Sequence, residues 1–206
     1  MTGRLGWAAT GKIGTQVVVP YRGDEYDYRH LKQMGDLGQI VPAFYSVRDA
    51  DRLRRLTESS DIVINLVGRD YETRNFSFED VHINAAAAIA KACKETGVQR
   101  LVHVSAAGAT KDSPSRFLST KRVGEDAVRA EYADATIIRP SWVFGNEDRF
   151  FNRIAFMHMM PTLPGDPLIN DGKAKFRPVY ISDVAEGIIR AARSSEAAGQ
   201  TYEFVG

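Results

Sequence analysis

The sequence lacks several features that would assign it to a specialised class of protein. Its single cysteine, Cys93, excludes an internal disulfide and is compatible with a reducing compartment. Its 27 lysines and arginines nearly balance its 26 aspartates and glutamates, so no net field favours nucleic acid or an anionic membrane. No apolar run approaches the ~20 residues that span a bilayer. What remains, with 44% hydrophobic residues, is the composition of an ordinary globular domain.

The two ends of the 206-residue sequence are expected to be incomplete. Residues 1–3 (MTG) lead directly into a glycine-rich stretch with no strand before it, and no signal or transit segment is visible. Residues 202–206 (YEFVG) are typical of a strand followed by a turn. We therefore expect residues 1–206 to form one α/β domain that is a fragment of a longer fold.

Short apolar segments alternate with longer helical patterns along the chain. Strands are predicted at residues 15–22 (TQVVVPYR), 39–46, 61–68 (DIVINLVG), 99–105 (QRLVHVS), 135–143 and 177–181. Helices are predicted at residues 48–59, 77–95, 120–131 and 184–193, with Gly97 ending the second and Asp183 capping the last. Continuous apolar strands between helices predict a Rossmann-like parallel sheet with helices on both faces. The Pro-, Gly- and Asp-rich loop 161–175 is expected to lie over the mouth of a site.

Two overlapping glycine motifs near the start compete as a pyrophosphate-binding turn. The motif at residues 9–14 (ATGKIG) leaves residues 15–19 before Pro20, which is too short and too β-branched for the helix it should open. The motif at residues 2–6 (TGRLG) leaves room for a short helix from Trp7, with Gly14 turning into the next strand. We therefore favour the first motif, which makes Gly3, Leu5 and Gly6 cofactor-binding residues; a flexible terminal turn is the alternative.

Arg22 closes the strand predicted at residues 15–22. In a dinucleotide-binding fold an acid at this position accepts from the ribose 2′-hydroxyl, whereas an arginine accommodates a 2′-phosphate. Arg22 therefore favours NADPH over NADH, and a solvated arginine at a strand end is the alternative.

Small residues gather where the other predicted strands end. Val67 and Gly68 end the strand at 61–68, Ser105 ends the strand at 99–105, and Pro140 and Ser141 follow another. Ligands of such sheets bind at the carboxyl edge, so we interpret these five as further cofactor-binding residues. No metal site is predicted, because the four histidines have no ligand spacing, and Cys93 is expected to be buried within its helix.

Five stretches carry a resemblance to a known family. They are residues 20–40 (PYRGDEYDYRHLKQMGDLGQI), 61–81 (DIVINLVGRDYETRNFSFEDV), 97–109 (GVQRLVHVSAAGA), 139–152 (RPSWVFGNEDRFFN) and 178–188 (PVYISDVAEGI). The sequence resembles the extended or atypical short-chain dehydrogenases/reductases. More narrowly, it resembles their accessory-subunit branch in the peripheral arm of mitochondrial NADH:ubiquinone oxidoreductase, complex I. The resemblance implies bound NADPH, other complex I subunits as partners, a matrix-side peripheral location and no demonstrated turnover.

The sequence also departs from that family. The family has a first strand and a longer first helix before the equivalent of residue 15, and it continues well past the equivalent of Gly206. The first strand would lie between the strands at 15–22 and 61–68, so we expect these two to have unpaired edges and the chain to fold poorly. Ser46 stands where many relatives carry an aspartate beside the adenine.

The most informative departure concerns catalysis. In active members a tyrosine is the acid and base, a lysine four residues later lowers its pKa, and a serine orients the substrate. Ser105 and Lys121 match this pattern, but Phe117 stands in the tyrosine's place, where even the accessory subunits often keep tyrosine. Phe117 has no ionisable group, so we interpret it as a packed aromatic and Lys121 as retained for cofactor binding.

Three functions remain open on these residues. We favour a non-catalytic NADPH-binding accessory subunit that supports the assembly or stability of complex I. The alternative is an NADPH-dependent reductase of a small carbonyl substrate that uses Ser105, Lys121 and another acid, such as Tyr132 or a water. A weaker alternative is an NADPH-sensing regulator outside any assembly.

Overall fold

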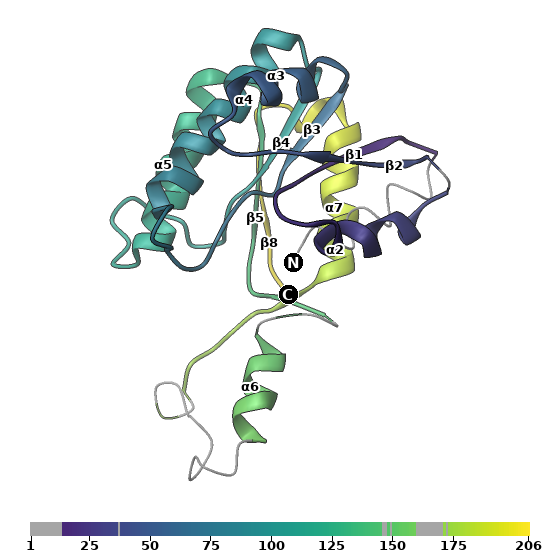
Figure 1. Cartoon of the computed structure of the whole chain (residues 1–206). Helices are drawn as coiled ribbons and strands as arrows, with labels where there is room; N and C mark the ends of the chain where they lie inside the picture. The colour runs from purple at the N-terminus through teal and green to yellow at the C-terminus, as the bar shows by residue number, and fades with distance from the viewer. Residues whose placement is uncertain (1–13, 37, 146–147, 149, 160–170, 172) are drawn as a thin grey trace.

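The computed structural model describes residues 14–36, 38–145, 148, 150–159, 171 and 173–206. Parallel strands form the framework of its fold (Figure 1). One sheet has the order β3-β4-β5-β8, made of β3 (Ile62–Asn65), β4 (Arg100–Val104), β5 (Thr136–Pro140) and β8 (Thr201–Phe204). Separately, β1 (Val17–Tyr21) pairs with β2 (Ile40–Phe44), and β6 (Val143–Phe144) pairs with β7 (Val179–Tyr180). All of these pairs are parallel, as the sequence predicted.

Helices cover both faces of the four-stranded sheet (Figure 1). α3 (Ala50–Glu58), α4 (Ala85–Thr96) and α5 (Arg116–Glu131) lie on one face, and α7 (Ile181–Arg193) lies on the other. Successive strand residues serve the two faces: Leu101 and Ile137 belong to the core under α4 and α5, whereas Val102 and Ile138 belong to the core under α7. This is the Rossmann-like α/β arrangement that the sequence predicted.

Shorter elements complete the described part of the chain. α2 (Glu25–Tyr28) and a 3₁₀ helix (Arg29–Met34) connect β1 to β2, a π-helix (Asp80–Asn84) leads into α4, and a 3₁₀ turn (Ser195–Ala197) follows α7. α6 (Phe151–His158) lies apart from the four-stranded sheet (Figure 1). No helix in the described ranges is long and apolar enough to cross a membrane.

Two helix ends follow local capping rules, and two helix starts differ from the prediction. Gly97 ends α4 in the left-handed conformation (φ 73°), as predicted, and the Asp49 side chain accepts from the Arg52 N–H at 2.9 Å to cap α3. The prediction that Asp183 caps the last helix is wrong, because α7 begins at Ile181 and places Asp183 within its first turn. There its carboxylate faces the positive end of the helix dipole. α5 likewise begins at Arg116, four residues before the predicted start at 120.

β1 and β3 do not pair with each other. Each pairs on one side, with β2 and β4 respectively, and among the described residues no strand lies between them. A cavity of about 670 Å³ separates them instead. The glycine motif at 2–6, the helix expected from Trp7 and most of the loop 161–175 lie outside the described residues.

Candidate nucleotide site

Lys121 is the centre of a buried polar cluster at the carboxyl end of β4. Its side chain is 6% exposed, and Nζ donates to the carbonyl oxygen of Val104 at 3.3 Å. Gly68 makes room for this amine, because a Cβ at position 68 would lie 2.9 Å from Nζ. Burial lowers the pKa of Lys121 from 10.5 to about 8, against the attraction of Glu125, which raises it. The structure therefore places the backbone of Gly68 in direct contact with the amine of Lys121.

The other strand-end residues surround this contact. Ser105 is buried, and its backbone N–H donates to the Ile138 carbonyl at 2.8 Å. The Val67 N–H donates to Asn65 Oδ1 at 3.0 Å, which shapes the turn after β3. The Pro140 carbonyl accepts from the Ala107 N–H at 2.9 Å, and the Ser141 hydroxyl donates to the Arg177 carbonyl. These residues therefore lie at, or just after, the carboxyl ends of three adjacent strands: Val67, Gly68, Ser105, Pro140 and Ser141.

A neutral histidine lies beneath Lys121. Asn65 Nδ2 lies 3.0 Å from His103 Nδ1, and Asn65 Oδ1 is taken by the Val67 N–H, so Nδ2 donates and His103 Nδ1 accepts. The proton of the ring is then on Nε2, which is buried and has no partner among the described residues. Burial, with the nearby charge of Lys121, lowers the pKa of His103 to about 3. His103 is therefore an uncharged support for the strand end.

Glu125 supplies the negative charge of the cluster. It is fully buried one helical turn after Lys121, and Arg139 of β5 holds both of its oxygens, at 2.9 and 2.6 Å. Burial alone would raise the pKa of Glu125, but the hydrogen bonds from Arg139 and Arg122 outweigh it and lower that pKa. The Ser105 hydroxyl lies beside Glu125 without meeting hydrogen-bond geometry. A buried, well-paired carboxylate of this kind fixes α5, and with it Lys121, against β5.

Phe117 lies one turn before Lys121 and packs on two other rings. Its ring meets those of His82 and Phe78 edge to face, with centroids 5.3 and 6.1 Å apart. His82 contacts Thr120 through Nδ1 and the Arg69 carbonyl through Nε2, both at 3.0 Å, and burial lowers its pKa to about 4. The packed-aromatic interpretation of Phe117 agrees with this arrangement, although the side chain is half-buried.

Tyr132, the other acid considered from the sequence, lies away from this cluster. It follows the last residue of α5, roughly 16 Å along the helix axis from Lys121. Its hydroxyl donates to the Val98 carbonyl at 2.9 Å. The geometry therefore gives Tyr132 a packing role rather than a place beside Ser105 and Lys121.

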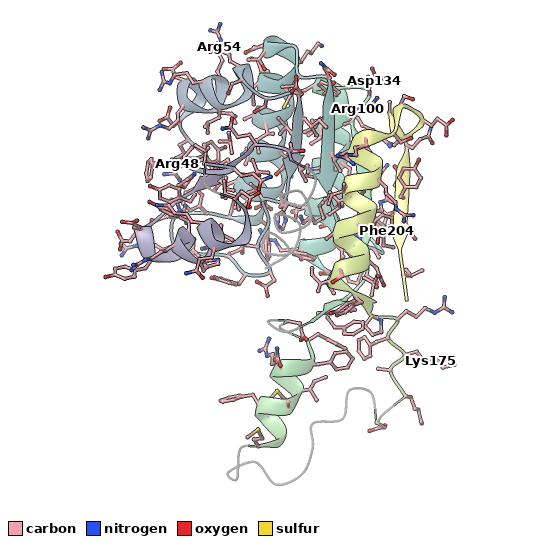
Figure 2. All side chains as sticks on the ribbon, turned by 90° about the vertical axis from the view of Figure 1, so that its right-hand side faces the viewer. Arg48, Arg54, Arg100, Asp134, Lys175 and Phe204 are labelled. Carbon is pink, nitrogen blue, oxygen red and sulfur yellow. The ribbon has the colours of Figure 1, made fainter. Side chains whose placement is uncertain are left out.

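A second feature of the site is a pair of arginines over one aromatic ring. The guanidinium carbons of Arg22 and Arg48 lie 4.9 and 4.7 Å from the centroid of Phe76. Arg48, labelled in Figure 2, also donates to the Asn75 carbonyl at 2.8 Å. Arg48 is also near Asp80, because its charge is among the causes that lower the pKa of that carboxyl. Two like charges held on one ring are suited to an anion such as a phosphate monoester.

The sequence indicated part of this site and missed part of it. Arg48, Phe76, His103 and Asn65 were missed, because nothing in their local sequence separates them from ordinary loop and strand residues. Glu125 was detectable, since it lies four residues after Lys121 and therefore on the same helix face. Gly3, Leu5 and Gly6 lie outside the described residues.

Comparison with known proteins gives this geometry its context. Residues 8–155 match the NAD(P)H-binding family. The chain is 47% identical over 197 residues to the mitochondrial NADH dehydrogenase (ubiquinone) 1 alpha subcomplex subunit 9 of Mus musculus. The aligned region covers 95% of this chain and 52% of the mouse protein. The protein of the same name from Arabidopsis thaliana is 46% identical, over 95% of this chain and 48% of the plant protein. The resemblance predicted from the sequence is confirmed, and the chain spans about half the length of these relatives.

A solved structure agrees on the fold. The crystal structure of UDP-glucuronic acid 4-epimerase from Bacillus cereus in complex with NAD superposes with a TM-score of 0.81 at 16% identity, over 100% of this chain and 75% of the epimerase. At that identity the likeness concerns the architecture, and it confirms the Rossmann-like assignment.

Proposed function

This chain belongs to the NAD(P)H-binding family, and we propose that it is a non-catalytic, NADPH-binding part of an accessory subunit of mitochondrial respiratory complex I. Its relatives of 47% and 46% identity carry the name of a complex I subunit, which supports the assembly role and a mitochondrial location. Its place is on the matrix side of the inner membrane, where it contacts other complex I subunits. The proposal that the subunit is not catalytic rests on Phe117, which stands where active members have tyrosine.

Phe117 removes the proton donor from an otherwise retained constellation. Ser105 and Lys121 are both present, and their retention favours the alternative, an NADPH-dependent reductase of a small carbonyl. However, the ring of Phe117 packs on His82 and Phe78 and has no proton to give. Positioned acid–base catalysis contributes roughly 10²–10⁴-fold in rate, so its loss leaves binding without efficient turnover. NADPH would supply a hydride if a substrate and an acid were present, and Lys121 would hold its nicotinamide end.

Turnover by the full-length protein tests this proposal. We expect no oxidation of NADPH above background with carbonyl substrates, and a measurable rate after Phe117→Tyr if a substrate still binds. The reductase alternative would be supported instead by robust turnover of the unmutated protein that Lys121→Ala abolishes while NADPH binding persists.

The preference for NADPH rests on Arg22 and Arg48. A 2′-phosphate between the two guanidinium groups would relieve their mutual repulsion and accept hydrogen bonds from both. We therefore expect NADPH to bind more tightly than NADH. Replacing Arg22 by alanine should narrow the difference by about 1.5–3 kcal/mol, the range for a hydrogen bond to a charged group.

Calorimetric titration of both nucleotides measures this difference. Arg54→Ala is the matched control, because Arg54 is an exposed arginine of the nearby helix α3 that pairs with Glu58 (Figure 2). Equal affinity of the unmutated protein for NADPH and NADH would refute the assignment. The assembly role is tested separately, by asking whether the gene restores the amount of assembled complex I in cells that lack this subunit.

A further inference from the structure

The ring of Phe76 lies on a short loop between β3 and α4, residues 72–79. The loop turns back on itself, because Thr73 and Phe76 exchange two backbone hydrogen bonds, of 3.0 and 3.3 Å. Ser77 and Asp80 close its far end, since the side chain of each accepts from the backbone N–H of the other, at 3.1 and 3.0 Å. The position of the ring therefore depends on what holds the two ends of this loop to the rest of the fold.

Arg116, the first residue of α5, connects both ends of this loop to the helix that carries Lys121. Its guanidinium donates to both carboxylate oxygens of Glu72, at 3.1 and 3.3 Å, and to Glu79 at 3.0 Å. Glu72 Oε1 also accepts from the backbone N–H of Phe78 at 3.0 Å, so the same carboxylate ties the start of the loop to its end. One guanidinium therefore binds the first and the last residue of the loop, and we call these three ion-paired side chains the Arg116 clamp.

The Arg116 clamp is more than a single exposed ion pair. Its side chains are 62%, 35% and 45% exposed, and an isolated pair at such a position contributes little to stability. Here, however, the arginine holds Glu72 through two N–H bonds, and Glu79 shares the same guanidinium. Without Arg116 the two carboxylates would repel each other at the base of the loop. The loop would then hold the ring of Phe76 less firmly against Arg22 and Arg48.

We propose that Arg116 is a positioning residue for the 2′-phosphate of NADPH, acting through the loop rather than by contact with the phosphate. It holds the ring of Phe76 where Arg22 and Arg48 both lie on it, at 4.9 and 4.7 Å, and so keeps their two guanidinium groups together. This inference rests on the proposed preference for NADPH. Because NADH lacks the 2′-phosphate, loss of the Arg116 clamp should weaken NADPH binding and leave NADH binding nearly unchanged.

Calorimetric titration of NADPH and NADH with the full chain measures the ratio of the two affinities. Arg116→Gln should lower the preference for NADPH roughly three- to fivefold, the upper range for an exposed network of ion pairs. Glu72→Ala should also lower it, and the direction of this change separates two explanations. If Arg116 acted only through its positive charge, removing the negative charge of Glu72 would strengthen NADPH binding instead.

Arg190→Gln is the matched control, because Arg190 is an exposed arginine that pairs with Glu186 on α7, on the other face of the sheet. It should leave the ratio unchanged. Hydrogen exchange at residues 73–78 should be faster in Arg116→Gln and Glu72→Ala than in the unmutated protein. An intact NADPH preference in both variants, an equal loss of both nucleotides, or a stronger preference in Glu72→Ala would each overturn the inference. Equal affinities in the unmutated protein would instead refute the proposed function on which it rests.

Discussion

Replacing the buried amine of Lys121 should change how the stability of the protein depends on pH. Burial lowers the pKa of this lysine from 10.5 to about 8 in the folded chain, so the folded state releases the proton before the unfolded state does. Between pH 8 and 10.5 the unfolded chain holds more protons, and the free energy of unfolding therefore rises with pH. The full shift corresponds to about 3 kcal/mol. Below pH 8 the penalty of the buried charge is constant.

Lys121→Met tests this because it keeps the length of the side chain and removes the charge. Urea unfolding followed by circular dichroism, from pH 7 to 10.5, gives the free energy of unfolding of both proteins. We expect the wild type to gain about 3 kcal/mol relative to the variant over this range. All other ionisable groups are common to the two proteins, so the difference between the two curves isolates the contribution of Lys121.

The control is Lys91→Met, which removes one positive charge from the exposed surface of α4. Its curve should run parallel to that of the wild type. If the Lys121→Met curve also runs parallel to the wild type at every pH, the amine is not desolvated in the folded protein. The contact of Lys121 with Gly68 and Val104 would then be wrong.

Two further predictions concern the same helix and strand. Gly124→Ala should lower the melting temperature, because the new Cβ would lie 2.1 Å from the His82 carbonyl oxygen. This clash should outweigh the higher helix propensity of alanine, which is worth about 1 kcal/mol. Val123→Ala on the exposed side of the helix is the control, and equal stabilisation by both substitutions would contradict the contact with His82. Burial lowers the pKa of His103 to about 3, so the protein should lose stability as pH falls below 6.5, because the unfolded chain binds a proton that the folded chain does not. A melting-temperature profile from pH 7 to 4 should be shallower in His103→Gln, with the remaining slope due in part to His82.

The sheet could be predicted from sequence because its strands are continuous apolar runs. Residues 99–105 and 135–140 need no long-range information to be assigned, since VHV and TII patterns flanked by helices have one natural place in a covered parallel sheet. The start of α7 was misplaced because Asp183 satisfies the rule for a cap as well as the rule for a first turn. α2 was missed because four residues are too few to show a helical period. α6 was missed although Phe151, Ile154 and Ala155 have helical spacing.

Site residues could be predicted from sequence where their position at the end of a strand defines their role. They could not be predicted where their role depends on contacts between distant parts of the chain. Ser105 and Gly68 follow from the rule that ligands meet the carboxyl edge of the sheet. Phe76 does not, because its role depends on two arginines 54 and 28 residues earlier in the chain. The glycine at 68 was read as space for a cofactor, and the structure gives that space to an amine.

The stacking of Arg22 and Arg48 on Phe76 also has a mechanical consequence. The arginines follow β1 and β2, whereas Phe76 belongs to the segment after β3, on the far side of the cavity. The ring of Phe76 therefore connects the β1–β2 pair to the four-stranded sheet, although β1 and β3 form no hydrogen-bonded pair with each other. If a phosphate binds both guanidinium groups, as proposed, its binding and this contact between the two parts of the fold would stabilise each other.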